Sequence, residues 1–167
     1  MRHTVTMIVL LLLAVLLQSH VASASESEFE AFLGRFDYEL RDDMKIDSKG
    51  LLPLLLNGKA VLVDVRFKEE VAAWRTGFGQ NIPLNDLPKR INDLPKDKII
   101  VVACPHKDRS AIAMAYLRSK GYNAKYLTDG LLGLAEQLRG ERAKDFMGAL
   151  ERQTKVDKSN TGKGDGQ

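Results

Sequence analysis

Cysteine, histidine and tryptophan are scarce in this sequence. Its 167 residues include one cysteine, three histidines and one tryptophan. A single cysteine excludes an intramolecular disulfide, and no cluster of residues has the spacing of a metal site. We therefore expect no metal and no cofactor. The fold must depend on its hydrophobic core, and a chain of 167 residues is long enough to form one even if a short terminal segment is removed.

A strong excess of charge of one sign is also missing. The net charge is +3 and the sequence pI is about 9.0, so the chain is only mildly basic. Aromatic residues make up 7% of the sequence and are not interleaved with basic residues in a stripe. No internal repeat is visible. We expect no nucleic-acid partner.

One long hydrophobic run, Met7 to Leu17, lies near the start of the chain. Arg2 precedes it, and Ala22-Ser23-Ala24 follows as a small-x-small cleavage site. This order is typical of a secretory signal peptide over residues 1–24. The run is shorter than the ~20 residues that span a bilayer, although an uncleaved anchor is the alternative and the only expected route to the membrane. We expect a periplasmic or secreted protein, cleaved near Ala24.

The only cysteine, Cys104, follows a continuous apolar run, Ile99 to Ala103. Such a run predicts a strand buried on both faces, as in a parallel sheet. The segment from Ser110 to about Lys120 predicts a helix that Gly121 closes. Cys104 is therefore expected at the carboxyl end of a central strand and beside a helix N-terminus, where open α/β sheets place their ligand sites.

That position favours a reactive thiol at Cys104. A helix N-terminus stabilises a thiolate, and inward-facing loop N–H groups bind anions. His106, Lys107 and Arg109 add cationic side chains, with Asp108 opposing them. The alternative is a buried cysteine that acts only as a small hydrophobe. In an exported protein, an unpaired cysteine indicates a free reactive thiol or an intermolecular bond.

The segment Cys104-Pro105-His106-Lys107-Asp108-Arg109-Ser110 resembles the active loop of single-domain rhodanese sulfurtransferases, in which Cys-x-x-x-x-Arg is followed by Ser. Three further segments resemble that family, in its order along the chain: Val61-Leu62-Val63-Asp64-Val65-Arg66, Asn81-Ile82-Pro83-Leu84, and Gly121 to Leu127 with Asp129-Gly130. The resemblance covers residues 44 to 140. Residues 25–43 would then be an N-terminal helical extension, and residues 141–167 a C-terminal helix and disordered tail.

The resemblance implies a rhodanese-like, doubly wound parallel α/β sheet with helices on both faces. The alternation of predicted strands and helices points to the same fold class. The implied activity is transfer of a sulfane sulfur from a small anionic donor, such as thiosulfate, to a thiol or cyanide acceptor. Cys104 would be the catalytic residue and carry a persulfide. Pro105, His106, Lys107, Asp108, Arg109 and Ser110 would bind the donor, and a protein could serve as the sulfur acceptor.

Two departures from the family pattern concern the site. Lys107 stands where the family commonly has glycine, so the loop is either strained there or follows a different path. The family's histidine before the third strand is missing. Trp74 and Phe78, in the same region, could pack in the core or line the mouth of the site. Arg66 resembles one half of a structural charged pair with Asp64, but it could also bind substrate, and we include it among the candidate binding residues.

Two other functions compete with sulfur transfer. A carrier or sensor could hold the persulfide, or bind a partner, without turnover. A cysteine phosphatase also cradles an oxyanion at a helix N-terminus, but its arginine lies six positions after the cysteine. Here Arg109 lies five positions after Cys104, and the smaller loop suits sulfur better than a phosphoryl group.

The remaining segments follow from hydrophobic spacing. From Ser25 the pattern predicts a helix with an aromatic stripe that continues to Leu40 and packs on the domain or binds a partner. Strands are expected at 45–46, 60–65, 82–84 and 124–127. Helices are expected near 48–56, 67–75, 87–94 and 131–138, with Pro53 tolerated only near its helix's first turn. The composition of Val156 to Gln167 predicts disorder.

Overall fold

The computed structural model describes residues 28–161, with side chains described to residue 155. The chain forms two units, residues 1–37 and 38–167. The predicted signal peptide over 1–24 lies outside the described residues. In the first unit residues 28–34 are helical, and i to i+3 hydrogen bonds from Arg35 and Phe36 end the helix. The prediction of one helix through Leu40 is therefore wrong, since a separate helix, α2 (Tyr38–Asp43), follows.

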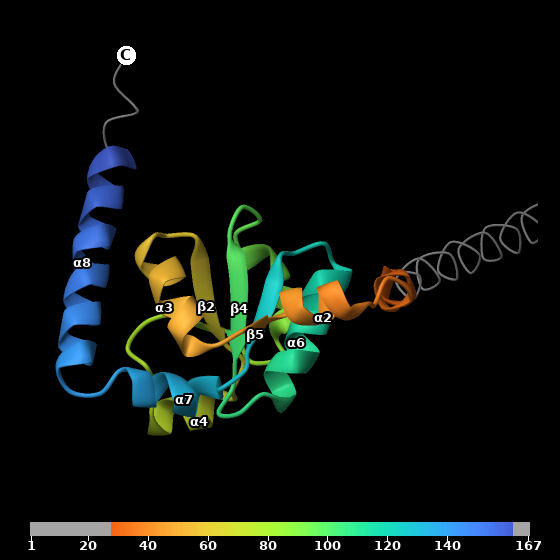
Figure 1. The fold of residues 1–167 in the computed structure, drawn as a ribbon, viewed down its shortest axis with the longest axis horizontal. Helices are drawn as coiled ribbons and strands as arrows, with labels where there is room; N and C mark the ends of the chain where they lie inside the picture. The colour runs from red at the N-terminus through yellow and green to blue at the C-terminus, as the bar shows by residue number, and fades with distance from the viewer. Residues whose placement is uncertain (1–27, 162–167) are drawn as a thin grey trace, which may run out of the picture. The chain divides into compact units, whose positions relative to one another are not determined.

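The second unit contains a five-stranded parallel sheet with strand order β1-β5-β4-β2-β3 (Figure 1). The strands are β1 (Lys45–Ile46), β2 (Ala60–Asp64), β3 (Gln80–Asn81), β4 (Ile99–Ala103) and β5 (Ala124–Leu127). Strand β4 lies at the centre, in register with β2 from Ala60–Ile99 to Asp64–Ala103. The sequence places four of the five strands within a residue. It places β3 at 82–84, two residues later than the paired residues Gln80 and Asn81, although the Ile82 and Leu84 N–H groups still donate to the Asp64 and Val65 carbonyls at 3.0 and 3.1 Å.

Helices cover both faces of the sheet, which confirms the predicted fold class. The helices after α2 are α3 (Ser48–Leu56), α4 (Lys68–Ala73), α5 (Leu87–Arg90), η1 (Ile91–Asp93), α6 (Asp108–Ser119), α7 (Gly130–Gln137) and α8 (Glu141–Thr161). Leu51 of α3, Leu131 of α7 and Phe146 of α8 pack with Leu62 and Val101 on one face. Helix α6 packs on β4 and β5 from the other (Figure 1). None of the described helices is long and apolar enough to cross a membrane.

Helix α3 begins where the side chain of Asp47 accepts a hydrogen bond from the Gly50 N–H at 2.8 Å. Pro53 is its sixth residue, deeper in the helix than the sequence predicts. Proline has no backbone N–H and so leaves one hydrogen bond of the helix unmade. The side chain of Pro53 is exposed, so this missing hydrogen bond lies on the solvent side of α3. The carboxylate of Asp129 accepts a second hydrogen bond at the start of α3, from the Ser48 N–H at 3.1 Å. This contact ties the start of α7 to the start of α3.

The C-terminal helix is longer than predicted. Helix α8 continues to Thr161, so the prediction of disorder from Val156 is wrong over residues 156–161. These six residues contain no proline or glycine, and they extend a helix whose earlier part, from Glu141 to Lys155, is rich in strong helix formers such as lysine, glutamate and alanine. The prediction for residues 162–167 falls outside the described part of the chain. Phe146, Met147 and Leu150 hold the first half of α8 against the sheet unit.

Candidate active site

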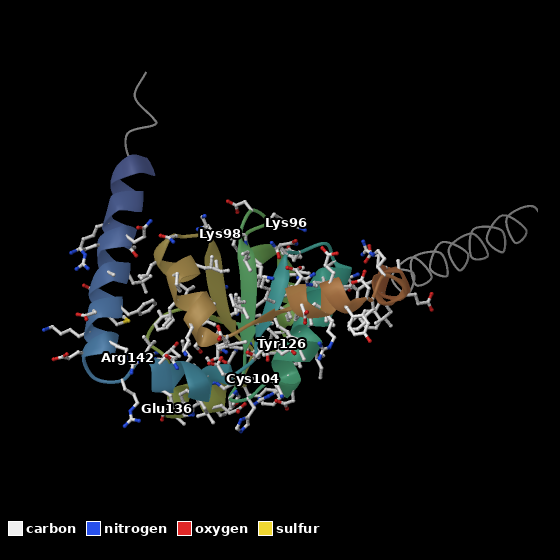
Figure 2. All side chains as sticks on the ribbon, viewed as in Figure 1. Lys96, Lys98, Cys104, Tyr126, Glu136 and Arg142 are labelled. Carbon is white, nitrogen blue, oxygen red and sulfur yellow. The ribbon has the colours of Figure 1, made fainter. Side chains whose placement is uncertain are left out.

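Cys104 lies directly after β4, at the carboxyl end of the central strand, as predicted. Figure 2 shows it at the opposite edge of the sheet from Lys96 and Lys98, which precede β4. Its side chain is fully buried, and its Sγ donates a hydrogen bond to Oδ1 of Asp108 over 3.3 Å. The hydroxyl oxygen of Ser110 lies 3.7 Å from the sulfur on the buried side. Two loop side chains therefore contact the thiol directly.

The loop reaches α6 without a left-handed residue. Lys107 is the N-cap of α6 with φ −153° and ψ −10°, and no described residue other than glycine has a positive φ. The different loop path is therefore the one adopted, and lysine at the family's glycine position carries no such strain. The Lys107 carbonyl accepts hydrogen bonds from the Ala111 N–H at 2.9 Å and the Ser110 hydroxyl at 3.1 Å.

Asp108 places a carboxylate over the thiol at the first residue of α6. Hydrogen bonds from the Arg109 backbone N–H, and then from the Cys104 thiol, hold the pKa of this carboxyl below its ordinary value. The N-terminus of α6 thus already binds one anionic group that belongs to the protein. An external anion has to compete with Asp108 for this position.

The guanidinium of Arg109 is engaged by Glu70, a residue that the sequence analysis missed. Its two terminal nitrogens donate to the carboxylate of Glu70 at 2.6 and 2.9 Å, and it lies 5.7 Å from the centre of the Phe67 ring. This pairing lowers the pKa of Glu70 to about 2 and raises that of Arg109. For Arg109 to bind a donor anion, as the resemblance implies, this ion pair would have to break.

Only a local signal points to Glu70 in the sequence. It follows Phe67 by three residues at the start of α4, and it accepts the Phe67 N–H at 3.1 Å in a capping arrangement. That spacing predicts a helix start. It does not show that the same carboxylate meets Arg109, which is 39 residues further along the chain.

The buried position of Arg66 favours the structural charged pair with Asp64 over the predicted role in substrate binding. Its side chain is fully buried and donates to the carboxylate of Asp64 at 2.7 Å and to the Trp74 carbonyl at 3.0 Å. The indole of Trp74 covers the guanidinium at 3.9 Å from the ring centroid. Solvent and substrate therefore do not reach Arg66. Trp74 is itself 39% exposed, which contradicts core packing, whereas Phe78 packs on Phe146 with ring centroids 5.1 Å apart.

The start of α7 supports the loop from the other side. The Leu131 N–H donates to the Cys104 carbonyl at 2.9 Å, and the Leu132 N–H donates to the Pro105 carbonyl at 3.3 Å. Gly130 has φ +63°, and a Cβ there would lie 2.3 Å from the carbonyl oxygens of both Pro105 and His106. The sequence marks Asp129-Gly130 only as a turn. The structure shows that glycine is needed at position 130 because the active loop lies against it.

These contacts define what the site presents to solvent. His106, Lys107 and Asp108 are exposed, Pro105 and Arg109 are half-buried, and Cys104 and Ser110 are buried. Because Glu70 offsets Arg109, Lys107 is the loop cation without an ion-pair partner among the described side chains. The site therefore combines a buried thiol, a helix N-terminus, one free cation and one competing carboxylate.

The family model of the rhodanese-like domain matches residues 49–137, which include β2, β4, the Cys104 loop and all of α7. The chain belongs to the rhodanese-like family. The match confirms the family that the active-loop motif suggested. Helix α8 and the N-terminal unit lie outside the matched residues.

A relative and two solved structures show the same family. The chain is 35% identical over 79 residues to a sulfurtransferase of Allochromatium vinosum, an overlap that spans 47% of this chain and 74% of the relative. It resembles the structure of a rhodanese-related protein from Thermoplasma volcanium with 27% identity and a TM-score of 0.51, over 56% of this chain and 91% of that one. A rhodanese-like domain protein from Staphylococcus aureus gives 30% identity and a TM-score of 0.50, over 54% and 89%. Together, family and relatives support sulfurtransferase activity.

Proposed function

We propose that this protein is an exported sulfurtransferase that moves a sulfane sulfur from a small anionic donor, such as thiosulfate, to a thiol or cyanide acceptor. The observation that supports this most directly is the position of the Cys104 sulfur. It lies at the carboxyl end of β4, within hydrogen-bond distance of the first residue of α6. There, helix N–H groups can stabilise both the thiolate and the persulfide that replaces it.

The reaction has two steps. The Cys104 thiol loses its proton, and the thiolate attacks the outer sulfur of thiosulfate. A sulfur–sulfur bond forms at Cys104 while the sulfur–sulfur bond of thiosulfate breaks, and sulfite leaves with the electron pair. Cyanide or a thiolate then attacks the outer sulfur of the persulfide. Thiocyanate or a new persulfide leaves, and the Cys104 thiolate is regenerated.

The side chains around the thiol divide between binding and positioning. Lys107 attracts the anionic donor at the mouth, and the Ser110 hydroxyl lies beside the reacting sulfur. The carboxylate of Asp108 accepts a hydrogen bond from the Cys104 thiol, and it occupies the N-terminus of α6 until an anionic sulfur donor arrives. Glu70 and Arg109 clamp α4 to the start of α6 and so hold the loop in place.

Export to the periplasm or outside the cell is part of the proposal. It is supported by Arg2, the apolar run from Met7 to Leu17 and the Ala22-Ser23-Ala24 site in the sequence. In an oxidising compartment a lone thiol has no intramolecular partner, so Cys104 can cycle between thiol and persulfide without forming an internal disulfide.

Steady-state formation of thiocyanate from thiosulfate and cyanide tests the proposed reaction. We expect turnover by the parent protein and none by Cys104→Ser. The acceptor panel should include small thiols and a protein dithiol, because these classes of acceptor differ in size. Persulfide formation with negligible turnover across the panel would support a carrier instead. Phosphate release from an aryl phosphate without a sulfur adduct would support a phosphatase.

A further inference from the structure

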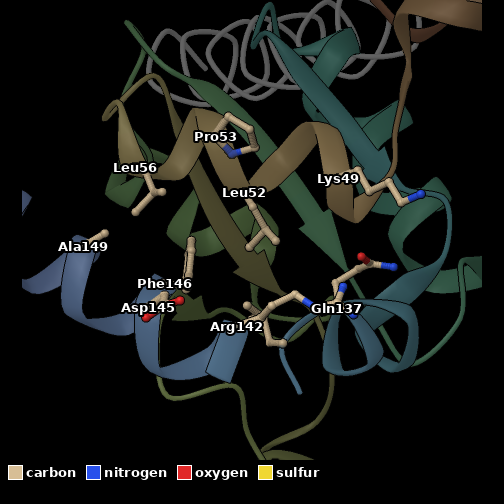
Figure 3. Close-up of a pocket in the computed structure, with 10 residues that line it drawn as sticks. Lys49, Leu52, Pro53, Leu56, Gln137, Arg142, Asp145, Phe146 and Ala149 are labelled. Carbon is tan, nitrogen blue, oxygen red and sulfur yellow. The ribbon is translucent and has the colours of Figure 1, made fainter. Parts of the chain in front are cut away.

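A groove lies between α3 and α8 (Figure 3), and none of its lining residues belongs to the Cys104 loop. Its volume is about 590 Å³. It is lined by ten residues from α3, α7 and α8, and from the residue that follows α7: Lys49, Leu52, Pro53, Leu56, Gln137, Leu138, Arg142, Asp145, Phe146 and Ala149. The family match ends at residue 137, so helix α8, which forms one wall, is an addition of this chain to the common domain.

The walls of the groove are mostly apolar. Leu52 and Leu56 face it from α3, and Phe146 and Ala149 face it from α8 (Figure 3). Its volume falls within the roughly 300–1,000 Å³ of typical small-molecule sites, which are mostly apolar with a few polar groups that orient the ligand. Burial of an apolar ligand chain would remove this apolar surface from water, which favours binding.

Three of the four polar lining residues lie toward one end of the groove, whereas Asp145 lies nearer to Phe146 and Ala149 (Figure 3). Figure 3 shows Lys49, Gln137 and Arg142 toward one end of the groove, with Leu56 and Ala149 toward the other. Neither Lys49 nor Arg142 has an ion-pair partner among the side chains that the structure describes. Asp145 is the single carboxylate among the lining residues, so the two cations leave an excess positive charge. A ligand complementary to this groove has an apolar chain and one anionic end.

We infer that this groove binds a free fatty acid, with its chain along Leu52, Leu56, Phe146 and Ala149 and its carboxylate beside Lys49 and Arg142. The Gln137 amide can donate a further hydrogen bond to the carboxylate. Cationic amphiphiles are disfavoured by the same excess charge. This inference is independent of sulfur transfer, because no lining residue belongs to the Cys104 loop or contacts it through an interaction described above.

Calorimetric titration of the purified protein with laurate, below its micelle concentration, tests the inference. We expect one laurate per chain, bound about tenfold more tightly than dodecanol, a difference that corresponds to ~1.4 kcal/mol. Dodecyltrimethylammonium should bind more weakly than either. Lys49→Gln and Arg142→Gln should each weaken laurate binding about three- to tenfold and leave dodecanol binding unchanged, since both side chains are exposed and their loss should not disturb the core.

Two further variants distinguish binding in the groove from binding elsewhere on the protein. Lys144→Gln removes an exposed cation from α8 that does not line the groove, and it should bind laurate like the parent protein. Ala149→Phe should fill the groove and abolish binding. Equal affinities for laurate and dodecanol, or unchanged binding by both charge variants, would overturn the inference. So would several laurates per chain that Ala149→Phe does not reduce, or a dimer that Ala149→Phe dissociates, because the occupant would then be a second copy.

Discussion

At the scale of single residues, Asp108 and Lys107 have opposite effects on an anionic donor. Asp108→Asn removes a negative charge from the position that the donor must take. We expect the KM for thiosulfate to fall about fivefold, because two like unit charges ~4 Å apart in water repel each other by about 1 kcal/mol. Lys107→Ala should raise the same KM and make the rate less dependent on salt. Steady-state kinetics at two ionic strengths measures both effects.

An increase in KM for Asp108→Asn would contradict this account. It would mean that the carboxylate assists the donor, for instance by taking the thiol proton, more than it repels it. His106→Ala is a suitable comparison, since it removes an exposed side chain of the same loop and leaves Lys107 and Asp108 in place.

The Glu70 carboxylate predicts a pH dependence of stability. Its pKa falls from 4.5 to about 2 in the folded protein because Arg109 donates to it. Between pH 2 and pH 4.5 the unfolded chain binds more protons at this carboxyl than the folded chain does. The contribution of Glu70 to folding stability is therefore complete above pH 4.5 and is lost as the pH falls through about 2. Glu70→Gln lacks it. Thermal unfolding should therefore separate parent and variant at pH 6 and bring them together at the acid end.

Glu69→Gln is the matched control for Glu70→Gln. Glu69 is the exposed neighbour on α4 and forms no ion pair among the described residues. Its variant should unfold like the parent protein across the whole pH range. A difference in unfolding temperature between the parent protein and Glu70→Gln that persists unchanged to pH 2 would contradict this prediction. It would show that the stabilisation does not come from the ionised Glu70 carboxylate.

At the scale of elements, the contact between α7 and the active loop depends on Gly130. Gly130→Ala would place a Cβ 2.3 Å from two carbonyl oxygens and force a left-handed φ on alanine. We expect a loss of about 3 kcal/mol in the free energy of unfolding, together with reduced sulfur transfer, because the loop must move. Denaturant unfolding and thiocyanate assays on the same samples measure both.

Gly121→Ala separates backbone strain from the steric contact. Gly121 has φ +79°, but nothing lies within 4 Å of the added Cβ. We expect a loss of about 1 kcal/mol with activity intact. If both variants lose the same stability and activity, the close approach of the loop to Gly130 has no energetic importance.

Sequence reasoning succeeds for elements whose burial is uniform. Strand β4 is read correctly because Ile99 to Ala103 is apolar at every position, and a strand buried on both faces requires this. It is less accurate for the edge strand β3, where only Gln80 and Asn81 pair with β2 and neither is apolar, so the pair carries no hydrophobic pattern. It also fails at the end of α8, where residues 156–161 are mostly polar and mostly weak helix formers and only continue a helix that the preceding residues establish.

At the active site too, sequence reasoning predicts the local features and misses the long-range contacts. The position of Cys104 follows from local pattern, since a strand, a short loop and a helix are contiguous in the chain. The partners of that loop are not contiguous. Glu70 and Gly130 reach it from α4 and α7, and their contacts depend on the relative placement of three elements. A single sequence contains no periodicity that encodes such contacts, so Arg109 is recognised while its partner is missed.

At the scale of the whole molecule, the proposal requires export and cleavage. We expect N-terminal sequencing of protein recovered from the periplasm or medium to begin at or near Ser25, because the Ala22-Ser23-Ala24 site precedes it. An intact Met1 on the exported protein would show an uncleaved anchor. Recovery of all the protein from the cytoplasm would contradict export.

Sulfur loading of Cys104 tests the central claim most directly. Purified protein is incubated with thiosulfate, desalted, and examined by intact-protein mass spectrometry before and after addition of cyanide. The account predicts a species heavier by one sulfur atom, which cyanide converts back to the original mass with release of thiocyanate. Cys104→Ser should show neither step. Sulfur transfer by Cys104→Ser at the rate of the parent protein would contradict the account.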